Sequence, residues 1–220
     1  MADPFNCYPV PYLRLYDEVL HHMLTIFAPR GFAALKITRP EGLKWEWFMT
    51  QHALAEPALF NVRLLFASGD MIKLGVLPRE VSYWLQDKAI KSINEALGDP
   101  KRAISDPLIL AVGRIALHES IYGDRQAANT MHRPAQRRMI DMRGGMGALD
   151  FPPLVKRLMR WSDGMMAMKG GAQRLLEDDD AEQNFTLEQS VNVSANWFPW
   201  ESKAWKRRIR PITGKPEETT

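Results

Sequence analysis

Hydrophobic side chains recur about every three or four residues along most of the chain, which is the spacing that places them on one face of an α-helix. The first such segment begins at Pro11 and carries apolar side chains as far as Phe27. A breaker cluster, Pro29-Arg30-Gly31, follows and predicts the end of this helix. Residues 31–43 are therefore expected to form a loop.

The same spacing predicts further helices, with proline near their starts and glycine or proline after their ends. Pro134 lies inside one of them and must kink or split it. The alternation typical of strands is almost absent, with residues 191–194 as a brief exception. The sequence thus predicts an all-α fold, an antiparallel array of about seven helices. The helices after the first are expected over residues 45–55, 57–74, 79–97, 105–122, 124–143 and 152–168.

Length and composition favour one globular domain. The chain has 220 residues, of which 45% are hydrophobic and 25% charged, an ordinary mixture for a protein with a buried core. We expect an N-terminal leader over residues 1–10 and a helical domain over 11–171. Residues 172–220 carry an acidic run and then a basic cluster, and they are expected to form a largely irregular tail.

Several classes of chemistry find no support in the sequence. Cys7 is the one cysteine, so an intrachain disulfide and a cysteine-rich metal site are excluded. No two of the histidines have the i, i+4 spacing of a helical metal site, and no serine lies in a nucleophile elbow. We therefore predict no metal, no cofactor and no catalytic residue, and thus a protein that is not an enzyme.

Localisation is judged from targeting signals. The N-terminus lacks the basic and apolar regions of a secretory signal, and no apolar run is long enough to span a membrane. An intracellular protein, nuclear or cytoplasmic and not bound to a membrane, is expected.

Three charged residues stand among apolar neighbours in the predicted helices. Because a buried charge needs a partner, we expect Arg143 to pair with Glu119 or Asp163 in a structural polar network. The alternative is that these three residues form the site of a small-molecule-binding protein or of an enzyme on a helical scaffold.

A basic cluster lies in the predicted tail and is a candidate nuclear-import signal. The net charge of +3, without a helix-turn-helix or zinc motif, speaks against sequence-specific DNA binding by this chain. Trp197, Trp200 and Trp205 lie nearby and are expected to dock the tail on the helical body, or alternatively to stack on bases. The basic residues are Lys203, Lys206, Arg207, Arg208 and Arg210.

A series of short phrases in a fixed order resembles the fungal-specific transcription factor domain, the regulatory domain of zinc binuclear cluster transcription factors. The resemblance covers about residues 11–168, and its most specific part is Arg143-Gly-Gly145 followed by Trp161-x-Asp163. One departure is Ala135-Gln136, where the family has a small residue and leucine. The other phrases are Glu56-Pro-Ala-Leu-Phe60, Lys88-Ala-Ile-x-x-Ile-Asn94, Leu97-x-Asp-Pro100 and Ser105-Asp-x-x-Ile-x-Ala-Val112.

The resemblance implies an all-α regulatory domain that binds protein partners or a small effector. The family's DNA-binding zinc cluster is built on several cysteines, whereas this chain has one. The resemblance therefore does not imply direct DNA binding here. The resemblance implies the fold class and a regulatory role, but it assigns no ligand and no catalytic residue.

Overall fold

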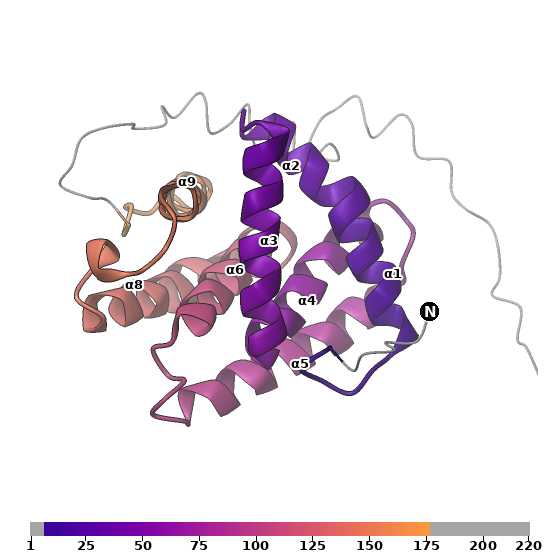
Figure 1. Ribbon diagram of the computed structural model, residues 1–220, viewed down its shortest axis with the longest axis horizontal. Coiled ribbons are helices and arrows are strands. Elements are labelled where there is room, and N and C mark those ends of the chain that lie inside the picture. Colours follow the sequence, from indigo (N-terminus) through magenta and orange to yellow (C-terminus); the bar gives the residue numbers. More distant parts are fainter. Residues whose placement is uncertain (1–6, 177–220) are drawn as a thin grey trace, which may run out of the picture.

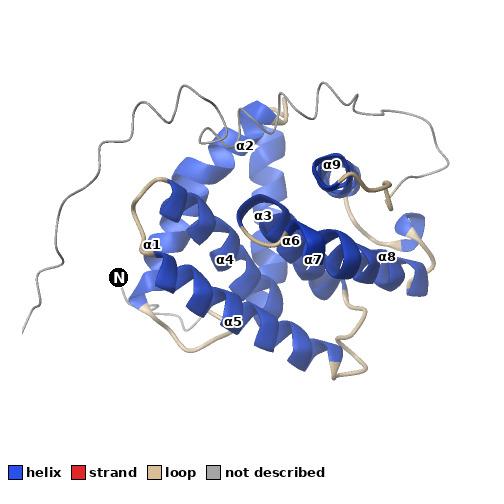
Figure 2. Ribbon diagram, turned by 180° about the vertical axis from the view of Figure 1, so that it is seen from behind, coloured by secondary structure: helices blue, strands red, loops and turns tan. Residues whose placement is uncertain are grey.

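The computed structural model describes residues 7–176, and within them it contains helices and no strand, which confirms the all-α prediction (Figure 2). The helices join into seven continuous helical stretches, as many as the sequence predicts. The elements are α1 (Arg14–His22), a π-helix (Met23–Phe27), α2 (Ala28–Ala34), α3 (Arg39–Ala55), α4 (Pro57–Lys73), α5 (Arg79–Leu97), α6 (Asp106–Tyr122), α7 (Arg125–Ala127), a second π-helix (Ala128–His132), α8 (Arg133–Met142), a 3₁₀ turn (Met146–Ala148) and α9 (Pro153–Gly170).

Helix α4 is the centre of the molecule (Figure 1). Its side chains are buried without interruption from Ala58 to Met71, because α1, α3, α5 and α6 all pack against it. Helix α6 continues the core outwards, and α8 and α9 pack on its other side. Long apolar helices such as α4 and α6 bury their whole circumference, whereas the outer helices bury one face.

Several helix ends lie where local signals predict them. The Ser105 hydroxyl accepts a hydrogen bond from the Leu108 N–H at 3.4 Å and caps α6. Gly171 follows α9 in the left-handed region, with a φ of 62° that glycine adopts without strain. At α3 the sequence prediction starts too late, because Thr38 and Glu41 form a capping box that begins the helix at Arg39.

The first helix does not end at Pro29, contrary to the sequence prediction, and helical backbone continues to Ala34. A proline removes one hydrogen bond and its ring collides with the carbonyl four residues earlier, which is Thr25. Here Thr25 lies in the π-helix, whose wider turn makes room for the ring. The Thr25 hydroxyl donates to the His21 carbonyl at 2.7 Å and so provides a donor for a carbonyl in the last turn of α1.

Pro134 is also accommodated by a π-helical turn that precedes it. The carbonyl four residues earlier belongs to Thr130, which lies in the second π-helix, and its hydroxyl donates to the Gln126 carbonyl at 2.9 Å. The predicted single helix over 124–143 is accordingly divided into α7, the π-helix and α8 without a break in the helical backbone. A Thr-x-x-x-Pro sequence thus marks both irregular turns.

Segments at both ends of the helical body pack against it. The Tyr8 hydroxyl donates to Asp17 at 2.7 Å, and its ring lies 5.1 Å from that of Phe60. After α9, the Gln173 carbonyl accepts a hydrogen bond from Arg133, and the Leu176 side chain is buried. The candidate nuclear-import residues, the three tail tryptophans and the rest of the chain from 177 lie outside the described residues.

None of the helices between residues 7 and 176 combines the length and the apolar character that a membrane span requires.

Candidate functional site

The predicted pairing of Arg143 with Glu119 or Asp163 is wrong, because Arg143 has closer partners at the start of α6. Its guanidinium donates to the Asp106 carboxylate at 2.7 Å and to the Ile104 carbonyl at 3.0 Å. The side chains of Arg143 and Asp106 are 30% and 24% exposed. Arg143 therefore ties the end of α8 to the N-terminus of α6, where a carboxylate is also favoured by the helix dipole.

Arg143→Ala is expected to lower the free energy of unfolding by about 1 kcal/mol, because a partly solvated pair contributes little. The loss of a fully buried pair would instead cost about 3–5 kcal/mol. Urea unfolding followed by circular dichroism measures the difference. A loss in the larger range would contradict the solvated pairing with Asp106.

Asp163 does form a buried tie, with a partner that the sequence analysis did not identify. The Arg133 guanidinium donates to the Asp163 carboxylate at 2.8 Å, and the two side chains are 1% and 3% exposed. The other carboxylate oxygen accepts the Leu175 and Leu176 N–H groups at 2.7 and 3.0 Å. This pair joins α8 to α9 and holds the segment that follows α9.

Glu119 lies in a third, separate cluster. Its carboxylate accepts hydrogen bonds from Gln86 and from the Asp124 N–H, both at 2.8 Å, and the His118 ring nitrogen is 3.5 Å away. Burial raises the pKa of Glu119, but the interactions with His118 and the Asp124 N–H outweigh this and hold the pKa below its ordinary value. Glu119 is therefore a charged structural group, and the three predicted network residues are not brought together.

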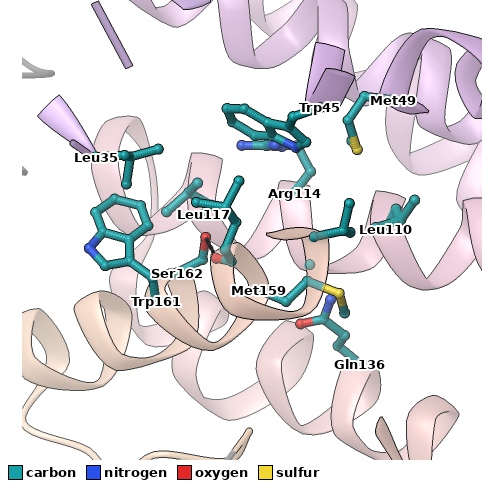
Figure 3. A pocket seen from close by; sticks show the side chains of 13 residues that line it. Leu35, Trp45, Met49, Leu110, Arg114, Leu117, Gln136, Met159, Trp161 and Ser162 are labelled. Carbon is teal, nitrogen blue, oxygen red and sulfur yellow. Dashed lines mark hydrogen bonds between the residues drawn. The ribbon is translucent and has the colours of Figure 1, made fainter. Parts of the chain in front are cut away.

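A pocket opens where α3, α6 and α9 meet, and Glu119, Arg143 and Asp163, the predicted site residues that the structure describes, do not line it (Figure 3). Its cavity volume is about 40 Å³. The walls are mostly leucine, valine, methionine and tryptophan, with few polar groups, which is the usual composition of a small-molecule site. The lining residues are Leu35, Trp45, Met49, Leu110, Gly113, Arg114, Leu117, Gln136, Val155, Leu158, Met159, Trp161 and Ser162.

Arg114 is the one charged residue among those that line the pocket. Its guanidinium carbon lies 5.5 Å from the centre of the Trp45 ring and 5.1 Å from that of Phe66, which are cation–π distances. Figure 3 shows the guanidinium beside the Trp45 indole. Burial lowers the pKa of Arg114 to about 10, so the group is still cationic at neutral pH.

The polar side chains of the pocket are engaged with the backbone. The Gln136 amide donates to the Ile109 carbonyl at 3.0 Å, and the Ser162 hydroxyl donates to the Leu158 carbonyl at 2.9 Å. Gly113 is required for this arrangement, because a Cβ at that position would collide with the Gln136 amide. The glycine therefore lets α8 approach α6 closely at the edge of the pocket.

A buried ion pair lies behind the pocket. Arg63 on α4 donates to the Glu46 carboxylate on α3 at 2.8 Å, and both side chains are buried. Both charges act on Arg114: Glu46 raises its pKa and Arg63 lowers it. The Glu46 carboxylate thus accepts a hydrogen bond from Arg63 and also raises the pKa of Arg114.

One pattern in the sequence indicates this site. Arg114 stands in the middle of an apolar run from Leu108 to Leu117, and Arg63 stands in a similar run on α4. A cation within a fully apolar helix is costly unless it has a function or a partner. The pattern marks both arginines but does not say which of them faces a cavity.

Among residues 7–176, no group of three or more histidine, cysteine, aspartate or glutamate side chains is placed to hold a metal ion. Comparisons with known protein families, with curated proteins and with solved structures found no match to this chain.

Proposed function

We propose that this chain is a non-catalytic regulatory module that binds a small effector in the pocket between α3, α6 and α9. The pocket itself is the observation that carries the proposal, because it joins helices that are far apart in the sequence (Figure 3). A ligand that contacts all three helices favours the arrangement in which they meet. Occupancy of the pocket thereby changes the surface that the module offers to partner proteins.

The polar groups of the pocket favour binding over catalysis. The Gln136 amide and the Ser162 hydroxyl already donate to backbone carbonyls. Arg114 remains protonated at neutral pH and is therefore no general base. The pocket thus offers one fixed cation and apolar walls, which select and hold a molecule.

The resemblance to fungal transcription factor domains supports a regulatory role, carried out in the nucleus or the cytoplasm through protein partners. One of its two most specific phrases, Trp161-x-Asp163, lies on a helix of the pocket: Trp161 lines the pocket, and Asp163 fixes α9 to α8. The chain's contribution to transcription is then made through proteins that bind DNA themselves.

The proposal is tested by closing the pocket. Ser162 is partly buried on α9, and Ser162→Leu extends an apolar side chain into the cavity. A thermal-shift screen with small neutral apolar compounds is expected to find compounds that raise the Tm of the wild type. At about a hundredfold excess over Kd, binding stabilises by about 2.7 kcal/mol, or roughly 5–10 °C.

Ser162→Leu is expected to abolish these shifts. Ser82→Leu is the matched control, because Ser82 is a partly buried serine on α5 that does not line the pocket. Binding at this pocket would be contradicted if the compounds still raised the Tm of the Ser162→Leu variant. It would also be contradicted if Ser82→Leu abolished the Tm shifts to the same extent.

A further inference from the structure

Arg114 is partly buried and has no hydrogen-bond or ion-pair partner within residues 7–176. Its contacts are with the Trp45 and Phe66 rings, which meet a guanidinium through their faces. Ring contacts of this kind do not satisfy the N–H donors along the edge of the guanidinium. A partly buried cation at a pocket wall, whose N–H donors have no acceptor among the described residues, is a site for an acceptor.

The buried charges around Arg114 do not balance. Glu46 is the carboxylate that acts on Arg114, and it accepts a hydrogen bond from Arg63. The formal charges of Glu46, Arg63 and Arg114 sum to +1. In addition, one terminal nitrogen of Arg63, Nη1, is buried without a hydrogen-bond partner. This cluster of three residues therefore has one positive charge that its carboxylate does not compensate, and Arg114 lies at the pocket.

We propose that the pocket binds a small monocarboxylate, whose carboxylate pairs with the Arg114 guanidinium and whose apolar chain lies between α6 and α9. This inference rests on the proposed function and names the chemical class of its effector. The carboxylate offers acceptors with the planar spacing that a guanidinium fork matches. The apolar chain then replaces water along Leu110, Leu117 and Leu158.

A monoanion fits the site better than a dianion does. One negative charge neutralises the net +1, whereas a phosphate dianion would leave a buried negative charge that no other lining residue can compensate. The volume of about 40 Å³ accommodates a carboxylate and a few carbon atoms. Met49 and Met159 lie in the walls, and their flexible side chains adapt to a longer chain.

The experiment compares hexanoate with hexanamide, which has nearly the same shape and no charge. Isothermal titration calorimetry on the wild-type protein is expected to show that hexanoate binds about 10- to 100-fold more tightly, because a charge-assisted hydrogen bond replaces a neutral one. Equal affinities, or tighter binding of hexanamide, would overturn the carboxylate inference while leaving a small-molecule pocket in place. Binding of neither compound would contradict both the inference and the proposed function.

Arg114→Met assigns the preference to this residue, because methionine keeps the unbranched apolar part of the side chain and removes the charge. The variant is expected to bind both compounds with similar, weak affinity. Arg143→Met is the control, since Arg143 lies outside the pocket, and it should keep the wild-type preference. A preference that persists in Arg114→Met would overturn the assignment, and if that variant does not fold, the wild-type comparison decides alone.

Discussion

Asp163→Ala is expected to lower the free energy of unfolding by about 3–5 kcal/mol, a large part of the stability of a domain of this size. The substitution leaves the Arg133 guanidinium, 1% exposed, without its carboxylate. It also removes the acceptor of the Leu175 and Leu176 N–H groups, so the segment after α9 loses two of its hydrogen bonds to the helical body. Urea unfolding followed by far-ultraviolet circular dichroism measures the loss.

The control for this prediction is Asp87→Ala. Asp87 pairs with Lys91 on the surface of α5, where the two side chains are 52% and 67% exposed. Removal of such a pair is expected to change the stability by less than about 1 kcal/mol. Similar losses in the two variants would show that burial of the Asp163–Arg133 pair does not determine its contribution.

Glu46→Ala is expected to lower the free energy of unfolding by a similar amount, again about 3–5 kcal/mol, because it leaves the buried Arg63 guanidinium without its carboxylate. Arg63 loses its hydrogen-bond partner at 2.8 Å, and Arg114 loses the charge that raises its pKa. Glu46→Gln keeps an acceptor for Arg63 and should therefore destabilise less than Glu46→Ala. Chemical unfolding of the two variants side by side measures the difference.

A double variant distinguishes two causes of lost stability: the loss of the ion pair itself and the presence of a buried arginine without a partner. Glu46→Leu combined with Arg63→Met replaces both partners by apolar side chains of similar length and is expected to recover much of the stability. A double variant as unstable as Glu46→Ala would show that the ion pair itself, rather than an unpaired arginine, accounts for the loss.

Local signals predicted the parts of the fold that local chemistry determines. Ser105 and Gly171 begin and end their helices as expected, because capping depends on neighbouring residues. Pro29 and Pro134 were predicted to interrupt helices, and the prediction of the first helix's end was wrong. The π turns that accommodate both prolines change the backbone hydrogen bonding within a continuous helix, and the spacing of apolar side chains does not indicate such a change.

The candidate site was less predictable than the fold. The sequence indicated that Arg143, Glu119 and Asp163 needed partners, but several carboxylates and cations were available for each. In the structure Arg143 pairs with Asp106, Glu119 with Gln86, and Asp163 with Arg133. The way in which helices distant in the sequence pack together determines these partners. Arg114 carried a usable signal, because it interrupts an apolar run. Whether such a cation faces a partner or a cavity is decided by tertiary structure.

The most direct measurement of the central claim is methyl NMR of the full chain with labelled methionines during a hexanoate titration. Met49 and Met159 line the pocket, whereas Met131 and Met142 are exposed outside it. We predict saturable shifts of the Met49 and Met159 signals, with those of Met131 and Met142 unchanged. Unchanged pocket signals at saturating hexanoate, or equal shifts at all four methionines, would contradict an effector site between α3, α6 and α9.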